Sequence, residues 1–450
     1  MTKEVQRETI RRIAAQAKAL GGRAMLVGGC VRDALLGRES ADIDCEVYGL
    51  APKQLQGLAA QFGAVDESGA RYGIFTLKDA GIDLAVPRME RRIGPKHGDF
   101  DVTPDPALSF ERAAARRDFT VNAILQDALT GEIVDPFGGQ ADLQRGVLRA
   151  VPGEGFCEDP LRVLRGAQFA ARFHLASDEE TLAKMRTMKT DDLSPARVRG
   201  EMQKAMASGA PDVFFDVLRQ ADALEPWFSE LAALIDVPQP PRYHPEGDAY
   251  IHSMLVLHAA AQKKAQAKHP EAFVYAALVH DLGKAVSTTR GEDGEWHTYG
   301  HENTGVPLAR AMLGRLGVPK EIIAYCENMC RLHMRAHVCH YGQVEAGRTN
   351  LLFDESVCPH DLALLAACDT IGKGTGGGDA PNEEAFLLGR VQAYEETVAM
   401  GMPDGDMLLA GGMEPGPEMA KALGEARRRT LLGENAEEAV KAVLKQKSRK

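Results

Sequence analysis

The sequence predicts an α+β protein, with a mixed head of short strands and helices followed by a mostly helical remainder. Within residues 1–150, brief apolar segments of strand length alternate with helical patterns, as is typical of α/β and α+β domains. From residue 158 onward, the apolar positions recur with helical spacing. The chain has 450 residues, more than one hydrophobic core usually holds, so we expect two or more domains.

The head begins with an amphipathic helix over residues 3–20, which a glycine pair ends. A short apolar strand over 24–27 leads through a second glycine pair into a helix over 31–36. Three further strands are predicted, over residues 42–47, 74–78 and 82–86. The head therefore contains at least four strands and two helices.

Beyond the head, helical patterns fill two long regions, residues 158–235 and 248–400. The segment between them, 237–245, is rich in proline and is interpreted as a linker or extended turn. Residues 371–379 form a glycine-rich loop, and the tail over 401–450 ends in a basic amphipathic helix. We expect four domains, namely a head over 1–150, a helical neck over 151–236, a helical domain over 237–385 and a helical tail over 386–450.

Composition indicates a soluble, cytoplasmic protein. Apolar residues make up 44% of the chain and charged residues 26%, which is ordinary for a globular protein. We expect no signal peptide and no membrane span, so the eight cysteines are interpreted as reduced thiols. The net charge of −11 argues weakly against nucleic-acid binding, but local clusters of arginine, which are the groups that meet phosphate, occur near residues 88–92, 112–117 and 162–172.

Two motifs in the head point to phosphate and metal chemistry. The turn Gly28-Gly29-Cys30-Val31-Arg32-Asp33 lies between a strand and a helix, where glycine allows the backbone to approach phosphate and the helix N-terminus favours an anion. Asp42 and Asp44 are two residues apart on the next strand, so both carboxylates face one way. Divalent metal relieves their repulsion, and Mg²⁺ prefers carboxylate and phosphate oxygens.

These motifs, taken together with two later ones, carry a family resemblance. Arg116-Arg117-Asp118-Phe119-Thr120-Val121-Asn122-Ala123 resembles the RRDxxxNA motif, and Glu158-Asp159-Pro160-Leu161-Arg162-Val163-Leu164-Arg165 resembles the EDxxRxxR motif, of nucleotidyltransferases in the polymerase-beta superfamily. With the glycine turn and the Asp-x-Asp strand in order, residues 20–235 are similar to class II CCA-adding enzymes and bacterial poly(A) polymerases. The resemblance implies a polymerase-beta-like head that uses Mg²⁺.

The resemblance also assigns roles in nucleotide binding. Asp159 and Arg162, three residues apart on one predicted helix face, are expected to match the Watson–Crick edges of C and A. Arg117 and Arg165 match positions that contact the phosphates or sugar, and Gly29 and Arg32 complete the nucleotide-binding set. An alternative for Asp159 and Arg162 is a simple ion pair at the start of the helix.

Three further features qualify the family pattern. Gln168 stands where the family often has another arginine, which puts one nucleotide contact and the C/A preference in question. Asp83 is interpreted either as a third carboxylate near the metal or as an ordinary polar residue at a strand end. Residues 88–96 resemble the loop that family members use to switch from C to A, and so favour an enzyme that adds A.

A second chemical constellation lies in the helical domain. His280 and Asp281 end an apolar segment, with His252 upstream and Asp369 downstream. This H…HD…D order resembles the metal ligands of HD phosphohydrolase domains and implies a divalent metal, with Mg, Mn, Ni and Zn left open. His301 and His333 match positions where some HD domains carry extra ligands, and for them an ordinary core role is equally open.

One cluster in this region has two interpretations. Cys326, Cys330, His333 and His337 have helical spacing, which allows a zinc site, but the pattern is not that of a standard finger. We favour ordinary helix packing of reduced thiols.

By resemblance, we expect a CCA-adding enzyme whose partners are tRNA, CTP and ATP. Asp42 and Asp44 would hold Mg²⁺, and the HD domain would separately hydrolyse phosphoesters, as in relatives with 2′,3′-cyclic phosphodiesterase activity. The basic helices after residue 160 and the basic tail are expected to bind the tRNA backbone. One alternative is an A-adding enzyme or poly(A) polymerase; the fused HD domain argues against poly(A) polymerase, but the motifs do not separate CCA addition from A-only addition. Another is an HD phosphohydrolase whose transferase-like half only binds RNA, against which the intact Asp42 and Asp44 argue.

Overall fold

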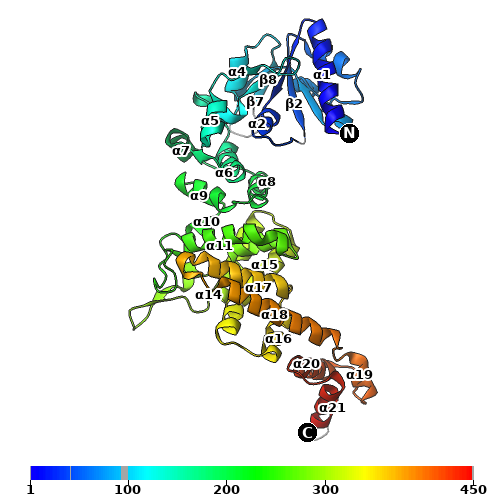
Figure 1. Ribbon diagram of the computed structural model, residues 1–450, viewed down its shortest axis with the longest axis vertical. Coiled ribbons are helices and arrows are strands. Elements are labelled where there is room, and N and C mark those ends of the chain that lie inside the picture. The colour runs from blue at the N-terminus through cyan, green and yellow to red at the C-terminus, as the bar shows by residue number, and fades with distance from the viewer. Residues whose placement is uncertain (1, 41, 93–99, 448–450) are drawn as a thin grey trace. The chain divides into compact units, whose positions relative to one another are not determined.

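A computed structural model describes residues 2–40, 42–92 and 100–447 of the chain (Figure 1). The chain forms two compact units, one from Met1–Ala205 with Val213–Pro226, the other from Met206–Asp212 with Trp227–Lys450. The expected head and most of the expected neck fall in the first unit, and the expected helical domain and tail fall in the second. The finer division into four domains stays a prediction.

A seven-stranded mixed sheet forms the centre of the first unit, in the order β3-β4-β5-β2-β1-β8-β9. The strands are β1 (Arg23–Val27), β2 (Ile43–Tyr48), β3 (Val65–Asp66), β4 (Ile74–Leu77), β5 (Ile82–Ala85), β8 (Leu125–Asp127) and β9 (Ile133–Val134). β2 and β5 pair in parallel, and the other neighbours pair antiparallel. The sheet and the helices around it confirm the predicted α+β class.

Strand β2 separates two cores because its side chains alternate between the faces of the sheet. Cys45 and Val47 pack with helices α1 (Lys3–Ala19) and α3 (Pro52–Ala59), which cover one face. Tyr48 belongs to the core on the opposite face, together with α4 (Phe110–Ala115). Asp44 and Glu46 share the face of Tyr48, so the fold brings the RRDxxxNA segment beside them.

Several predicted bounds shift by one or two residues. β2 begins at Ile43, so Asp42 immediately precedes the strand instead of lying in it. The helix expected over 31–36 is α2 (Gly29–Leu35). The expected loop over 88–96 begins in the hairpin of β6 (Arg88–Arg92) and β7 (Phe100–Pro104), and residues 93–99 lie outside the described residues.

Helices dominate the rest of the first unit. They are α5 (Gly139–Arg145), α6 (Leu161–Phe173), α7 (Glu179–Arg186), α8 (Pro195–Met206) and α9 (Asp212–Gln220), with a short parallel pair of β10 (Val147–Leu148) and β11 (Ala176–Ser177). A short 3₁₀ helix, η3 (Thr120–Asn122), packs against α2 and α5. Asp159 lies just before α6, not on it, which corrects the expectation that Asp159 and Arg162 share a helix face.

The second unit is helical apart from one small hairpin, β12 (Thr289–Arg290) with β13 (Trp296–His297). Its helices are α10 (Ser229–Ala232), α11 (Ala249–Lys263), α12 (Pro270–Val279), α13 (Lys284–Ser287), α14 (His301–Arg315), α15 (Lys320–Tyr341), α16 (Ala346–Glu355), α17 (Pro359–Gly372) and α18 (Ala380–Ala399). Residues 272–279 of α12 are all buried, which places this apolar helix at the centre, against α11, α15 and α17. The apolar run before His280 thus reflects a helix surrounded by other helices.

The described part of the tail is helical, as expected, and it ends in a helix that contains Lys441 and Lys445. Its helices after α18 are α19 (Gly405–Ala410), α20 (Pro417–Leu431) and α21 (Ala436–Lys447), and they enclose a small core of their own around Leu408 and Val440. Arg427 pairs with Asp354 on α16 at 2.5 Å, which ties α20 to the larger helical body. In the described part of the chain, no helix is both long and apolar enough to cross a membrane.

Two candidate active sites

A cavity of about 500 Å³ in the first unit brings the head motifs together. All six residues predicted to bind the nucleotide line it, together with Asp44: Gly29, Arg32, Arg117, Asp159, Arg162 and Arg165. These residues come from α2, from the segment after α4 and from the start of α6, three segments that are far apart in the sequence. The fold therefore assembles a single site from the separate motifs.

Three carboxylates meet at one edge of this site. Asp42 and Asp44 are both exposed, and the parallel register of β2 and β5 places Asp83 opposite Asp44 on the same face. Partial burial raises the pKa of the Asp44 carboxyl, Arg117 opposes that rise, and Asp83 and Asp42 add to it. A group of mutually repelling carboxylates that is open to solvent suits a divalent cation. The position of Asp83 favours its interpretation as a third carboxylate of the group.

A buried network explains the other residues of the RRDxxxNA motif. Arg32 Nη1 donates to Asn122 Oδ1 at 2.7 Å, and Asn122 Nδ2 donates to Asp118 Oδ1 at 2.9 Å. Asp118 Oδ2 in turn accepts from Arg165 Nε at 2.8 Å. Burial disfavours the charge of Asp118, but Arg165 and Asn122 hold the pKa of its carboxyl below the usual value. Asp118 and Asn122 thus link two predicted nucleotide contacts, Arg32 and Arg165, into one rigid array.

Glu46 plays a similar part for the arginine pair. Its side chain is buried, and Oε1 accepts from Arg116 Nη2 at 2.6 Å and from Arg117 Nη2 at 3.0 Å, while Oε2 accepts from Tyr48. Gly28 has a φ of 70°, and a Cβ there would lie 2.8 Å from Arg117 Nη1. Glycine at this turn therefore lets the Arg117 guanidinium lie against the backbone beside Asp44.

The predicted base-reading pair belongs to the same cavity. Asp159 Oδ1 accepts from the backbone N–H of Leu161, and the Arg162 guanidinium donates to the carbonyls of Gly155 and Arg116, each at 2.7 Å. Both side chains line the cavity, and their role in reading the base stays a prediction.

Gln168 also lines the cavity, and its effect on nucleotide binding stays open. Its buried amide donates to Glu201 Oε2 at 3.2 Å and accepts from Arg172 Nη1 at 3.0 Å. Arg172, one helical turn further along α6, also lines the cavity and brings a positive charge to it.

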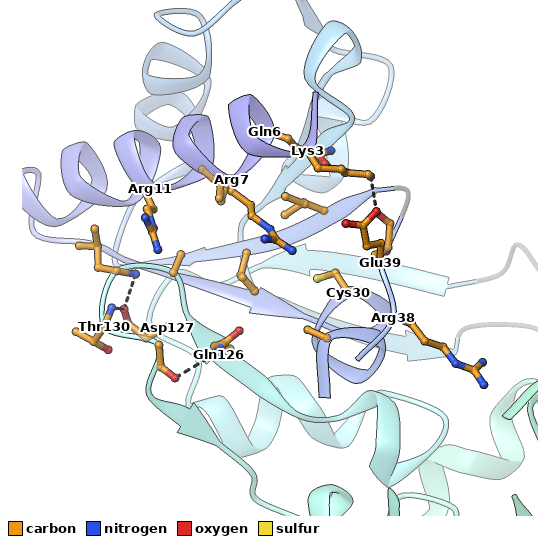
Figure 2. A pocket seen from close by; sticks show the side chains of 18 residues that line it. Lys3, Gln6, Arg7, Arg11, Cys30, Arg38, Glu39, Gln126, Asp127 and Thr130 are labelled. Atoms are coloured by element: carbon orange, nitrogen blue, oxygen red, sulfur yellow. Dashed lines mark hydrogen bonds between the residues drawn. The ribbon is translucent and has the colours of Figure 1, made fainter. Parts of the chain in front are cut away.

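The charge of the cavity differs in sign from that of the whole chain. Eight arginines and Lys204 line it, against three aspartates. A solvent-open cavity with this lining attracts polyanions, although the chain carries a net charge of −11. A second cavity, of about 440 Å³, lies between α1, the start of α2 and the turn after β8, and Figure 2 shows Arg7 and Arg11 extending towards it from α1. It contains Cys30 but none of the predicted site residues.

The second unit contains a cluster of six buried residues that sequence spacing had only partly connected. His252 lies on α11, His280 and Asp281 follow α12, His301 begins α14, and Asp369 lies on α17. The sixth, His333, lies on α15. Their side chains form two groups of possible metal ligands, His252 with His280 and Asp369, and Asp281 with His301 and His333, each with ligand atoms within 4.8 Å of one another.

Asp281 lies between the two groups. Its Oδ2 is 3.5 Å from His252 Nε2 and 3.3 Å from His280 Nε2, and its Oδ1 is 3.1 Å from His301 Nε2. Burial opposes its ionisation, but Lys284 Nζ lies 2.6 Å from Oδ2 and favours the charged carboxylate. The carboxylate can therefore contribute one oxygen to each group.

The four histidines all turn the same nitrogen inward. Each Nδ1 lies within hydrogen-bond distance of an acceptor: His280 meets the carbonyl of Ala277 at 2.9 Å, and His301 and His333 meet the carbonyls of Thr298 and Cys330, each at 2.6 Å. The fourth, His252, has its Nδ1 2.7 Å from Glu246 Oε1. With the proton on Nδ1, each Nε2 presents a lone pair to the cluster, the form that ligates metal.

The inward nitrogens fit a bound cation. His301 Nε2 and His333 Nε2 are 3.2 Å apart, a repulsive arrangement for two lone pairs unless they share a cation. His280 Nε2 is fully buried and has no hydrogen-bond partner among the described residues. Burial lowers the pKa of His333 to about 4, which keeps its ring neutral. The donor set therefore fits divalent metal. His301 and His333 are candidate ligands on the same geometric grounds as the four residues indicated by motif order.

The arrangement of the cysteines on α15 agrees with ordinary helix packing, the interpretation favoured from the sequence. Cys326 and Cys330 are buried, with their thiols directed to the carbonyls of Ala272 and His280. His333 and His337, one helical turn apart, approach different carboxylates, Asp281 at 3.6 Å and Asp369 at 2.7 Å. Among the described residues, the possible metal-ligand groups include no cysteine.

Comparison with known proteins agrees with this organisation. Residues 24–149 match the family model of the poly A polymerase head domain, and residues 249–371 match that of the HD domain. Residues 175–235, between them, match a model described as a probable RNA and SrmB binding site of polymerase A.

Solved structures share the fold at low sequence identity. The Bacillus stearothermophilus CCA-adding enzyme in complex with CTP aligns with a TM-score of 0.64 at 21% identity, over 100% of this chain and 98% of that one. The Thermotoga maritima CCA-adding enzyme complexed with tRNA aligns with a TM-score of 0.63 at 18% identity, over 99% and 96% of the two chains. At these identities, the likeness establishes the architecture.

Sequence relatives are considerably closer. A multifunctional CCA protein of Nitrosococcus oceani is 42% identical over 317 residues, which make up 69% of this chain and 74% of the relative. Another, of Xanthomonas campestris pv. campestris, is 36% identical over 423 residues, 89% of this chain and 96% of the relative. Since these identities extend across head, neck and HD regions alike, the chain belongs to the family of multifunctional CCA proteins.

Proposed function

We propose that this chain adds C and A from CTP and ATP to the 3′ end of tRNA, and that its HD domain hydrolyses phosphoesters at a centre of two divalent metals. The convergence of the head motifs around one cationic cavity, with Asp42, Asp44 and Asp83 at its edge, carries the first part. The inward-facing nitrogens of four buried histidines around Asp281 carry the second.

In the transferase site, each predicted residue has a distinct task. Asp42 and Asp44 hold Mg²⁺, with Asp83 beside Asp44 as a third carboxylate. Arg32, Arg117 and Arg165 bind the phosphates and sugar of the nucleotide, and the Gly29 backbone lets the phosphates approach the start of α2. Asp159 and Arg162 select the base.

The reaction joins the tRNA 3′-oxygen to the α-phosphorus of the nucleotide and releases pyrophosphate. Mg²⁺ bound at the carboxylates supplies activation of the 3′-hydroxyl and stabilisation of the leaving oxygen. The arginines oppose the charge that develops on the phosphates, and the network through Asn122 and Asp118 keeps them in place before the nucleotide arrives.

In the HD domain, His252, His280 and Asp369 hold one metal, His301 and His333 hold the other, and Asp281 lies between them. Four imidazoles and two carboxylates favour a transition metal such as Mn²⁺, Ni²⁺ or Zn²⁺ over Mg²⁺, which prefers oxygen ligands. Two metals in such a site bind a phosphoester and activate water for its cleavage. Phosphoesters at RNA ends, including 2′,3′-cyclic phosphates, are the proposed substrates.

Nucleotide incorporation tests the first part directly. Purified protein with Mg²⁺ is given tRNA transcripts that end before CCA, after C or after CC, with CTP and ATP offered singly and together. Growth of the shortest transcript to a complete CCA end, lost in Asp42→Ala, is the expected result. Addition to the CC-ended transcript alone would make this an A-adding enzyme, long A tails on any RNA a poly(A) polymerase, and no incorporation a phosphohydrolase with an RNA-binding half.

Hydrolysis tests the second part on the same preparation. Metal-depleted protein is assayed on a 2′,3′-cyclic phosphate after addition of Mg²⁺, Mn²⁺, Ni²⁺ or Zn²⁺ separately. We expect activity with one of the three transition metals and its loss in His280→Ala, with CCA addition unchanged. Hydrolysis that depends on none of these metals would refute the metal centre.

A further inference from the structure

Two buried glutamates support the metal-ligand cluster from outside the region that matches the HD family. The matched region covers residues 249–371, and that stretch supplies the six ligands of the proposed two-metal centre; His244 and Glu246, which with His252 form a third group of possible ligands, lie before it. Glu246 lies before it, and Glu383 lies after it on α18. The side chain of Glu246 is 3% exposed and that of Glu383 is fully buried, so both carboxylates are held by the protein instead of by solvent.

Glu246 directly follows the proline-rich segment 237–245 that the sequence suggested was a linker. Its Oε1 lies 2.7 Å from His252 Nδ1 and 2.9 Å from His244 Nδ1, so one oxygen accepts from two imidazoles. From the proline-rich segment itself, Gln239 Oε1 accepts from Lys284 Nζ at 2.7 Å, and Lys284 Nζ lies 2.6 Å from Asp281 Oδ2. Gln239 and His244 of this segment therefore contact the site, while residues 241–243 and 245 are exposed.

Glu383 acts on another ligand of the same group through one intermediate ring. His337 lies between two carboxylates, with Nδ1 2.7 Å from Glu383 Oε1 and Nε2 2.7 Å from Asp369 Oδ2. Thr370 Oγ1 donates to the other oxygen of Glu383. Because Asp369 Oδ2 is occupied by His337, its Oδ1 is directed to the cluster, where it lies 3.0 Å from His252 Nε2.

The support differs between the two ligand groups. Two of the three ligands in the first group, His252 and Asp369, depend on a side chain from outside the matched region. In the second group, both histidines are held by backbone carbonyls, those of Thr298 and Cys330, three residues before each ring. Side-chain substitutions can remove the first kind of support but not the second.

We propose that Glu246 and Glu383 are positioning residues for one metal of the pair, the one held by His252, His280 and Asp369. Glu246 fixes the ring orientation and proton position of His252, and Glu383 fixes Asp369 through His337. Carboxylates that orient metal ligands in this way typically contribute about 10- to 100-fold to metal affinity. The hydrolase unit then includes the segment before α11 and the start of α18. This inference rests on the two-metal centre proposed above.

Calorimetric titration of metal-depleted, full-length protein with Mn²⁺ tests the proposal. Because the transferase carboxylates also bind divalent metal, every protein in this titration carries Asp42→Ala and Asp44→Ala, and we expect the otherwise wild-type protein to bind two ions. In Glu246→Ala and in Glu383→Ala, one of the two ions should bind about 10- to 100-fold more weakly and the other as in the wild type. Glu246→Gln retains an acceptor oxygen for Nδ1, so it should recover part of the lost affinity.

The control is Asp379→Ala, which removes a carboxylate 2.7 Å from His340 Nε2 in the same unit but away from the six ligands. It should bind both ions as the wild type does. The thermal transition of the second unit, measured in parallel by calorimetry, reports that each variant is folded. Wild-type affinity for both ions in the two alanine variants would overturn the proposal, as would equal weakening of both ions without recovery in Glu246→Gln. If the wild type itself binds fewer than two ions, the two-metal centre fails, and this inference fails with it.

Discussion

Replacement of Asn122 by alanine tests whether the buried network positions the nucleotide-binding arginines. Asn122 accepts from Arg32 Nη1 at 2.7 Å and donates to Asp118 Oδ1 at 2.9 Å. Each partner is charged and nearly inaccessible, with 6% of the Arg32 side chain and 7% of the Asp118 side chain exposed. Water therefore cannot readily replace the lost amide, and Arg32 is left with Asp33 and the ring of Phe173 as its neighbours.

The expected loss of stability follows from these two contacts. A hydrogen bond to a charged group contributes about 1.5–3 kcal/mol, and the two bonds share one side chain, so we expect Asn122→Ala to lower the free energy of unfolding by about 3 kcal/mol. For a unit of this size, each kcal/mol corresponds to about 2–4 °C, so the thermal transition of the first unit should fall by about 6–12 °C. Scanning calorimetry of the full chain measures this shift.

The effect on activity should be separable from the effect on stability. Loss of one charge-assisted contact to phosphate, about 1.5–3 kcal/mol, lowers kcat/KM for CTP about 10- to 100-fold when assayed well below the transition. Gln126→Ala is the control, because that amide donates only to the Gly131 carbonyl at 3.3 Å within the described structure. A fall of less than 2 °C with unchanged kcat/KM would refute the network, and a full thermal shift with unchanged kcat/KM would show that Arg32 does not contact the nucleotide.

Three other perturbations separate the two sites. Asp44→Asn should reduce nucleotide incorporation by at least about 10³-fold, since it removes a metal-binding carboxylate, while phosphoester hydrolysis on the same preparation stays unchanged. Gly283→Ala should abolish hydrolysis, because a Cβ there would lie 2.0 Å from the carbonyl oxygen of His301, whereas Gly314→Ala, with nothing within 4 Å, should be silent in the same assay. Chelation of divalent metal should lower the thermal transition of the second unit more than that of the first, because the ligands in the second unit are buried and brought together only in the folded state, whereas Asp42 and Asp44 are exposed; an equal or larger shift of the first transition would contradict a buried metal centre in the HD domain.

Much of the transferase site could be predicted because its motifs are local. The alternation of β2 places Asp44 on one face, and the same period places Glu46 there, so its proximity to the arginines was available in the sequence. The pairing of Asp44 with Asp83 on β5 could not be predicted from the sequence, since it depends on β5 lying parallel and adjacent to β2. The position of Asp159 before α6, instead of on it, reflects how Pro160 sets the start of that helix.

The hydrolase site was less predictable, because its parts meet only through packing between distant helices. Motif order indicated His252, His280, Asp281 and Asp369, but His301 and His333 are joined to them by the packing of α15 against α12 and of α14 against α13 and α15. Glu383 lies beyond the glycine-rich loop and has no motif around it. The helical character of the tail could be predicted, but its separate core could not, because small apolar residues such as Ala422 and Ala426 bury α20 against its neighbours only through tertiary packing.

The net negative charge and the anionic substrate are compatible because several acidic residues lie beneath basic ones. Glu46 is buried under Arg116 and Arg117, and Asp118 is buried beside Arg165, so these carboxylates orient guanidinium groups without reaching the surface of the cavity. In the second unit, Glu246 and Glu383 are buried against imidazoles instead of arginines. The groups that face the metal position are therefore nitrogen lone pairs and not positive charges. A buried acid can therefore serve either a phosphate site or a metal site, and the side chain that it orients, guanidinium or imidazole, decides which.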